Sequence, residues 1–299
     1  MKTAGVILYG RWGDMFQAAN ILPGLKRAGY HVTFVSLPKW AIVLKNDPHI
    51  DQWLYTRLGD EIPTFDLTIR LQGVIVGTLL ADRSWSTAPA RHSINYHERI
   101  AEVAGVPLTK EARFYPTEDE KPIRSDGFHI VWCLAGSTFD KWNPHQNEAI
   151  QMVLDEMPEA TITLVGDESC QELETRWAEF PRVQCKSGRL PIRNTLALAQ
   201  VADCVVGPET GVLNAVAFEA NGKVVMLSHS GVDNLTKHWT NTESLYSDAP
   251  CHPCHRIHTT TEHCTVDEHG AAYCQGRITA RQIADAIGKH YKAWREVQP

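Results

Sequence analysis

The feature that most restricts the fold is an alternation of short apolar runs with helical patterns, repeated in two separate halves of the chain. In the first half, strand-like runs occupy residues 4–9, 31–36, 52–56 and 66–71, with helical segments between them. In the second half, runs at residues 128–134, 161–165, 203–206 and 224–227 alternate with helical segments in the same way. This pattern is typical of parallel sheets covered by helices on both faces.

A polar segment at residues 115–127, which contains two prolines and few apolar side chains, has the composition of a linker. The sequence therefore predicts an α/β protein of two Rossmann-like domains, residues 1–118 and 126–299, facing each other across a cleft. Pro23 should kink or break the first helix, expected at residues 14–28, and Gly29 suits a left-handed cap. An amphipathic helix at residues 279–297 is expected to cross back onto the first domain.

Composition narrows the class of protein. Hydrophobic residues make up 43% of the chain and charged residues 21%, as in ordinary globular domains. The net charge of −6 does not favour a nucleic-acid partner. No apolar run approaches the roughly 20 residues that span a bilayer, and the N-terminal apolar stretch is too short for a signal peptide. These features predict a cytoplasmic protein.

The turn after the first strand, residues 10–14, reads Gly-Arg-Trp-Gly-Asp. It should place Asp14 at a helix N-terminus beside the cleft, where a carboxylate can act as a general base toward an acceptor hydroxyl. A carboxylate at this position can equally serve as a helix cap, because its oxygen accepts hydrogen bonds from free backbone N–H groups. The spacing alone leaves both interpretations open.

Two further turns follow strands of the second half and have the composition of phosphate-binding turns. In residues 135–142, small and hydroxyl side chains would let backbone amides approach a phosphate, and Lys141 adds a positive charge. In residues 207–215, the free amides of Thr210 and Gly211 would open a helix whose positive end suits a diphosphate. Glu209 could accept hydrogen bonds from sugar hydroxyls. A helix-capping region without any ligand is the alternative.

Taken together, Gly13-Asp14, Lys141-Trp142 and Glu209-Thr210-Gly211 resemble the motifs of glycosyltransferase family 9, the heptosyltransferase-like family. The resemblance covers most of the chain and implies the double-Rossmann GT-B fold. It also implies a role for each matching residue. Asp14 would be the catalytic base, and the donor would be bound by Ser137, Thr138, Lys141, Thr210 and Gly211.

Two positions depart from the family pattern close to the donor sugar. Glu209 stands where the family usually has Asp, and Asn214 stands where it often has His. Residues 166–168 follow a strand where the family contacts the nucleoside.

The reaction implied by the resemblance is an inverting transfer that uses no metal ion in its chemistry. The donor would be a nucleotide-diphosphate sugar, ADP-heptose first, and the acceptor a saccharide, glycolipid or protein. A peripheral membrane contact through the acceptor and a homo-oligomer remain open. Two alternatives stand beside this interpretation. One is a nucleotide-sugar epimerase or hydrolase of the same architecture, and the other is a catalytically degenerate binding or assembly module.

Four of the eight cysteines fall in one polar segment at residues 250–275, with the spacing C-x2-C-x9-C-x9-C. This spacing predicts a four-sulfur site for a structural Zn or Fe ion formed by Cys251, Cys254, Cys264 and Cys274. Five histidines in the same segment could replace a thiol as ligand: His252, His255, His258, His263 and His269. Some members of the resembled family carry a comparable cysteine cluster associated with iron. Ser228-His229-Ser230-Gly231 follows a strand, as a hydrolase nucleophile can, but it lacks a nucleophile-elbow pattern and carries little weight as a catalytic site.

Overall fold

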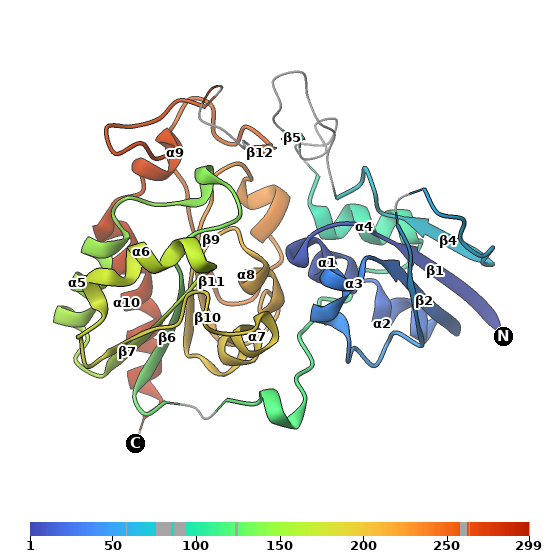
Figure 1. Ribbon diagram of the computed structural model, residues 1–299, viewed down its shortest axis with the longest axis horizontal. Helices are drawn as coiled ribbons and strands as arrows, with labels where there is room; N and C mark the ends of the chain where they lie inside the picture. The colour runs from blue at the N-terminus through green and yellow to red at the C-terminus, as the bar shows by residue number, and fades with distance from the viewer. Residues whose placement is uncertain are drawn as a thin grey trace.

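The computed structural model describes residues 1–57, 59–75, 85–86, 94–122, 125–257, 262 and 264–298. The chain forms two α/β halves that lie side by side (Figure 1). It passes from the first to the second near the short helical turn Glu118–Glu120, within the predicted linker. The predicted α/β architecture with two parallel sheets is confirmed, and the exact domain boundaries stay a prediction.

The first half is built on a four-stranded parallel sheet in the order β3-β2-β1-β4. Its strands are β1 (Lys2–Ile7), β2 (Tyr30–Ser36), β3 (Gln52–Tyr55) and β4 (Leu67–Arg70). Its helices are α1 (Trp12–Ala19), α2 (Leu22–Arg27), α3 (Pro38–Ala41) and α4 (Tyr96–Ala104). The predicted break at Pro23 is confirmed, since the proline opens α2 as a separate helix. Gly29, just after α2, has a φ of +81° and so takes the expected left-handed conformation.

The second half contains a six-stranded parallel sheet in the order β11-β10-β9-β6-β7-β8. Numbered from its own first strand, this is the Rossmann order 3-2-1-4-5-6 in reverse. Its strands are β6 (Phe128–Cys133), β7 (Ala160–Val165), β8 (Val183–Cys185), β9 (Cys204–Pro208), β10 (Gly222–Met226) and β11 (Thr242–Leu245). Its helices are α5 (Gln146–Glu156), α6 (Gln171–Glu174), α7 (Ile192–Val201), α8 (Gly211–Ala215), α9 (Tyr273–Gly276) and α10 (Ala280–Glu296).

A third, two-stranded antiparallel sheet joins the cysteine-rich segment to the first half. β12 (Arg256–Ile257) pairs with β5 (Trp85–Ser86), and the two strands lie side by side in Figure 1. None of the helices in the described part of the chain has both the length and the apolar composition needed to cross a membrane.

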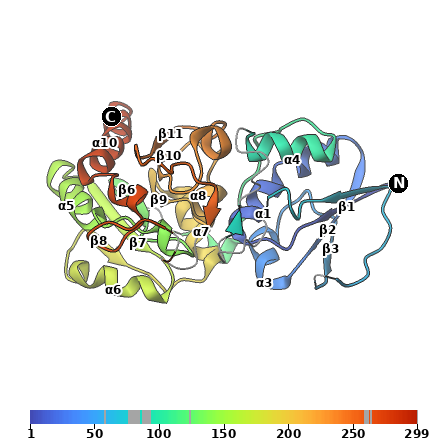
Figure 2. The same ribbon diagram turned by 90° about the horizontal axis from the view of Figure 1, so that it is seen from above.

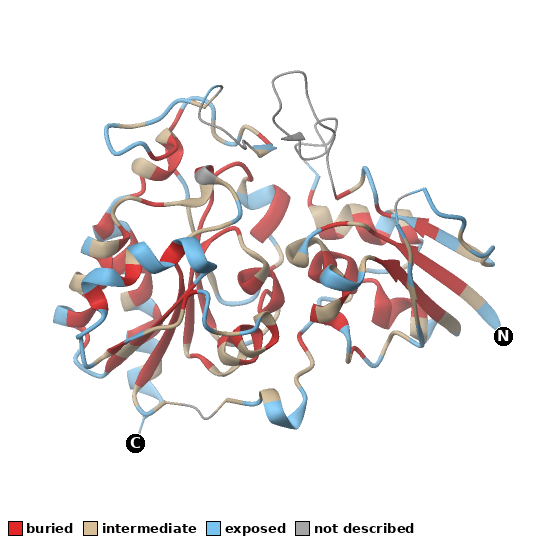
Figure 3. Cartoon of the chain, viewed as in Figure 1, coloured by how far each residue is buried: buried red, intermediate tan, exposed pale blue. Residues whose placement is uncertain are grey.

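The alternation of side chains along β6 explains how the layers pack. Phe128, Ile130 and Trp132 belong to the apolar cluster under α5 and α10, whereas Val131 and Cys133 point to the opposite face. That opposite face belongs to one continuous apolar cluster with β1, β2 and α1 of the first half. Buried residues accordingly extend through both sheets and the contact between them (Figure 3). The two halves are therefore packed together by their own cores.

The expected return of the last helix to the first domain is wrong. α10 packs against α5 and against strands β9, β10 and β11, at the end of the molecule remote from the first half (Figure 2). The reason is the composition of its apolar face, which fits the second half. Ile283 and Ile287 are fully buried in that core, and the ring of Tyr291 lies 5.4 Å from that of Phe128.

Candidate active site between the two halves

Both sheets have a topological switch point next to their first strand. β1 lies between β2 and β4, and β6 lies between β7 and β9. Ligands of such sheets bind outside the carboxyl ends of the strands at this point. The three turns identified in the sequence follow β1, β6 and β9, so all of them stand at a switch point. Helices α1 and α8, which follow two of these turns, pack against each other across the halves (Figure 1).

Asp14 lies in the first turn of α1 and faces the second half. Its Oδ2 atom accepts a hydrogen bond from the backbone N–H of Arg11 at 2.7 Å, so the capping interaction is present. Burial raises the pKa of Asp14 above its ordinary 3.8, although the Arg11 N–H and the Lys141 ammonium act in the opposite direction. A raised pKa makes the carboxylate a stronger base. The two interpretations of Asp14 are thus compatible.

The turn after β6 brings Ser137, Thr138 and Lys141 together. The N–H of Gly136 donates to the carbonyl of Lys141 at 3.1 Å, and the N–H of Lys141 donates to the carbonyl of Thr138 at 3.0 Å. A Cβ atom at Gly136 would lie 2.5 Å from Cδ of Lys141, so only glycine lets the lysine cross the turn without displacement. The Lys141 ammonium then donates to the backbone carbonyl of Glu209 at 2.9 Å. This bond joins the turns after β6 and β9.

Glu209 is enclosed behind the site. Its side chain is 5% exposed, and its Oε1 atom accepts the N–H groups of Ser228 and Ser230 at 2.9 and 3.0 Å. Its Oε2 atom lies 2.7 Å from Nδ1 of His229, which is also buried and lies 3.7 Å from Asp140. Burial disfavours the charged carboxylate, but the His229 imidazolium outweighs this and lowers the pKa of Glu209 to about 2. Both carboxylate oxygens of Glu209 are therefore engaged inside the protein.

The start of α8 is packed against the first half. Thr210 caps its own helix, since its Oγ1 atom accepts the N–H of Leu213 at 3.4 Å. A Cβ atom at Gly211 would lie 3.0 Å from Cβ of Trp12, so the two halves pack closely around this glycine. Asn214 is buried and donates through Nδ2 to the carbonyl of Thr210 at 2.9 Å. Donor binding by these residues stays a prediction.

A cavity of about 350 Å³ opens beside the turn after β6. Its volume lies at the lower end of the range for small-molecule sites. Asp167, in the segment expected to contact a nucleoside, contributes to its wall opposite Ser137 and Thr138. The full lining is Ala135, Gly136, Ser137, Thr138, Trp142, Asp167, Ser169, Cys170, Glu172 and Leu173.

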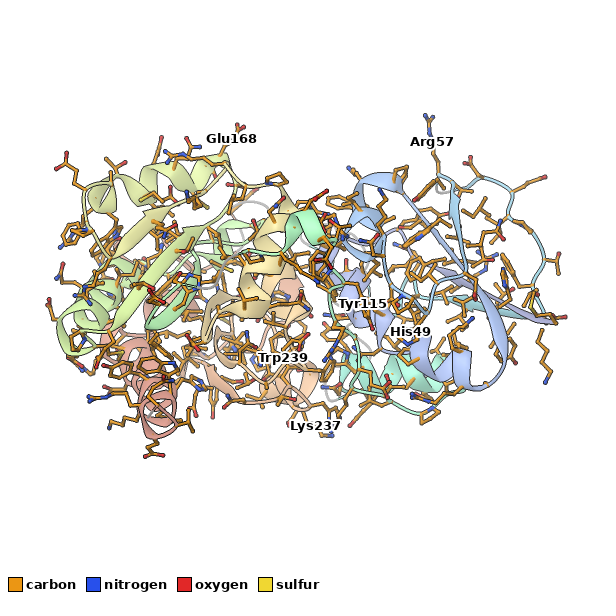
Figure 4. All side chains as sticks on the ribbon, turned by 90° about the horizontal axis from the view of Figure 1, so that it is seen from below. His49, Arg57, Tyr115, Glu168, Lys237 and Trp239 are labelled. Atoms are coloured by element: carbon orange, nitrogen blue, oxygen red, sulfur yellow. The ribbon has the colours of Figure 1, made fainter. Side chains whose placement is uncertain are left out.

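Other contacts fix the two halves relative to each other. The indole N–H of Trp239 lies 3.4 Å from Nε2 of His97, and the guanidinium of Arg193 donates to the carbonyl of Tyr115 at 2.9 Å. Trp239 and Tyr115 lie between the halves, as Figure 4 shows. The site turns are thus held in place by packing on both sides.

The four cysteines of the 250–275 segment line a second cavity, of about 200 Å³. Asp140, Ser228 and His229 form its inner wall, so it adjoins the buried side of the active-site turns. Among the described residues, however, no three Cys, His, Asp or Glu side chains are arranged to hold a metal ion. The predicted metal-binding loop is therefore not shown, and His258 and His263 lie outside the described residues.

The same segment supports the loop that holds Glu209. The N–H of His255 donates to the carbonyl of His229 at 2.9 Å, and Nε2 of His252 lies 3.1 Å from the carbonyl oxygen of Ser230. His229 and this support were not recognised in the sequence. The available signal was the position of a polar Ser-His-Ser run directly after β10, at the same sheet edge as the other turns.

No known family profile matches the amino-acid sequence, and neither does any curated protein. Solved structures match it over nearly its whole length. The structure of E. coli ADP-heptose LPS heptosyltransferase II is 13% identical, with a TM-score of 0.70 over 99% of this chain and 100% of that one. A family 9 glycosyltransferase from Veillonella parvula is 13% identical, with a TM-score of 0.72 over 98% of both chains.

The iron-containing dodecameric glycosyltransferase TibC from enterotoxigenic E. coli is also 13% identical, with a TM-score of 0.71 over 100% of this chain and 80% of that one. At this identity the likeness shows the fold. The resemblance to glycosyltransferase family 9 noted in the sequence is confirmed at that level, and the chain has the GT-B architecture of these enzymes.

Proposed function

We propose that the protein is an inverting glycosyltransferase that moves a heptose-like sugar from an ADP-linked donor to a saccharide, glycolipid or protein acceptor. The observation that carries the proposal is the meeting of Asp14, from the first switch point, with the Lys141 turn, from the second. A base and a cation on facing sheet edges are what transfer from a diphosphate requires. The ADP-heptose enzyme among the similar structures supports this choice of donor.

In the proposed reaction, Asp14 takes the proton from the acceptor hydroxyl. The acceptor oxygen attacks the anomeric carbon from the face opposite the diphosphate, and the bond from that carbon to the phosphate oxygen breaks. Lys141 stabilises the negative charge that develops on the departing nucleotide, a preorganised electrostatic effect. Ser137, Thr138, Thr210 and Gly211 line the path of the phosphates. In this proposal Lys141 supplies the positive charge that faces the leaving group, and the step uses no metal ion.

Glu209 and Asn214 have a positioning role in this proposal. The enclosed carboxylate of Glu209 fixes the turn whose carbonyl binds Lys141, and Asn214 fixes the next turn of α8. Asp167 and its neighbours in the 350 Å³ cavity would receive the nucleoside.

We further propose that Cys251, Cys254, Cys264 and Cys274 hold a structural Zn or Fe ion. The donor set fits such an ion, because four thiols line one cavity and soft thiolates select Zn and Fe. Burial raises the pKa of Cys254 to about 11 and that of Cys264 to about 12, so a cation is needed to ionise them at neutral pH. Bound there, the ion would supply structural cross-linking of the segment. The iron content of TibC supports this assignment.

Thermal stability of the purified protein with ADP, UDP, GDP or CMP in excess tests the donor site. A ligand at about 100 times its dissociation constant adds roughly 2.7 kcal/mol of stability. Stabilisation by ADP, followed by transfer from ADP-heptose that falls about 10²–10⁴-fold in Asp14→Asn, would support the proposal. Absence of stabilisation by every nucleotide would contradict it, and unchanged transfer in Asp14→Asn would remove the base from the mechanism.

A further inference from the structure

A second cation reaches the phosphate turn from the opposite half of the molecule. Arg11, in the turn after β1, extends its exposed side chain across to the turn after β6, where Nη1 donates to Oγ of Ser137 at 2.5 Å. Ser137 is itself exposed and lines the 350 Å³ cavity. The guanidinium therefore contacts a side chain that lines this cavity.

The charges around this point are unevenly matched. In the described part of the chain, no carboxylate lies within 4.0 Å of Arg11 or Lys141 in an ion pair, and each cation donates to an uncharged oxygen. The charge of Lys141 acts to lower the pKa of three nearby acids, Asp14, Asp140 and Glu209, but none of the three forms an ion pair with either cation. Two cations whose hydrogen-bond partners are uncharged oxygens, one from each half, can exchange those partners for the oxygens of an anionic ligand.

Arg11 differs in this respect from arginines that make comparable long-range contacts. Arg193 and Arg113 each connect distant segments of the chain, and each ends on a carboxylate, that of Glu120 or that of Glu219. Arg11 ends on a hydroxyl that can be released at little cost, because water or a ligand oxygen can replace it. A planar guanidinium can then bind two phosphate oxygens at once.

We propose that Arg11 binds the diphosphate of the donor from the first half, opposite Lys141, exchanging its bond to Ser137 for phosphate oxygens. This inference rests on the proposed function and adds to it a residue that the matched motifs do not contain. It also gives donor binding a consequence for the base. The N–H of Arg11 holds Oδ2 of Asp14, so a phosphate bound by Arg11 fixes the turn that carries the base.

Titration calorimetry of the purified protein with ADP and with AMP tests the inference. Arg11→Gln should weaken ADP binding about 10- to 100-fold, the range for loss of a charge-assisted bidentate contact. Because AMP has no β-phosphate, Arg11→Gln should weaken AMP binding less than about 3-fold. Arg11→Lys keeps the charge but loses the planar guanidinium, so its affinity for ADP should lie between those of the wild type and Arg11→Gln. The matched control is Arg57→Gln, an exposed arginine at the outer edge of the first half (Figure 4).

The outcomes separate this inference from the function beneath it. If the wild type binds ADP and Lys141→Gln loses it, the donor site stands. If Arg11→Gln then binds ADP within 2-fold of the wild type, the role of Arg11 is refuted on its own. Equal losses for ADP and AMP also refute it, because they indicate a loosened interface between the halves. If the wild type binds no nucleoside diphosphate, both proposals fail together.

Discussion

Replacing His229 with leucine should destabilise the second half strongly, because two buried carboxylates would lose their shared cation. His229 is 6% exposed, Glu209 5% and Asp140 3%. The imidazole lies 2.7 Å from Glu209 and 3.7 Å from Asp140. Without it, two like charges would face each other in the interior, with backbone N–H groups, the hydroxyls of Ser228 and Ser230, and Lys141 nearby.

The size of the effect follows from burial. Opposite charges about 4 Å apart attract by about 4 kcal/mol at an effective dielectric constant near 20, and desolvation of the ions offsets part of this. Removing one partner of a buried pair typically costs about 3–5 kcal/mol. At roughly 2–4 °C per kcal/mol for a domain of this size, the melting temperature should fall by about 6–20 °C.

His238 provides the matched control. Its Nε2 atom lies 2.6 Å from Glu98, a similar distance, but the two side chains are 18% and 40% exposed. Because solvent screens this pair, His238→Leu should cost less than about 1 kcal/mol. Scanning calorimetry of both variants at pH 6 makes the comparison. Equal losses in the two variants would refute the argument that burial decides the contribution.

The pH dependence of wild-type stability is a second test of the His229–Glu209 pair. Burial lowers the pKa of His229, but the facing Glu209 outweighs it and raises the pKa above 6.5. A raised histidine pKa contributes stability that is present below pH 6.5 and lost as the pH rises through the folded value. The lowered pKa of Glu209 contributes stability above pH 4.5 that is lost as the pH falls toward about 2. The loss of stability caused by His229→Leu should therefore be largest between pH 4.5 and pH 6.5 and should become smaller at alkaline pH.

Three further predictions concern the site. Asp14→Asn should raise the melting temperature at neutral pH, even though it slows transfer, because burial raises the pKa of Asp14 and makes its charged form costly. The gain should vanish below about pH 3.8, and a lower melting temperature at pH 7 would contradict this reasoning. Gly136→Ala should weaken ADP binding about 10- to 100-fold, because the added Cβ would displace Lys141. Calorimetry measures this loss, and Gly288→Ala is the control, since its added Cβ makes only an ordinary contact at 3.4 Å. The protein purified from metal-supplemented cells should contain about one Zn or Fe per chain, measured by elemental mass spectrometry. Cys254→Ser should lose this metal, whereas the control Cys185→Ser should keep it. Metal-free wild-type protein of full stability would contradict the assignment.

The strands and turns that carry the site could be predicted because their signals are local. The apolar runs that precede Gly10 and Gly207 locate β1 and β9, although not their exact ends, and Pro23 marks a helix break by its own geometry. β8 and β11 were not predicted. Each is short, and the residues of β11 are only half-buried, so neither forms a continuous apolar run.

The partners of the site residues could not be predicted, because they depend on contacts distant in sequence. Glu209 accepts hydrogen bonds from Ser228 and Ser230, and Arg11 reaches Ser137 across 126 positions of the chain. The prediction that α10 returns to the first domain was wrong for the same reason. Amphipathicity shows that a helix has an apolar face but does not say which surface that face will cover.

The enclosure of Glu209 bears on the departure from the family motif. An aspartate at this position would be shorter by one methylene, whereas the glutamate reaches back to the N–H groups of residues 228 and 230 and to His229. The longer acid is therefore matched by a local partner, and its backbone carbonyl still receives Lys141. The buried ion pair costs desolvation energy, and its hydrogen bonds hold the turn in one conformation. The substitution is therefore accommodated by a turn rebuilt around the longer acid, and we expect this turn to keep its hold on Lys141. Transfer from ADP-heptose by the wild type, greatly reduced in Asp14→Asn, is what distinguishes the transferase from a binding module.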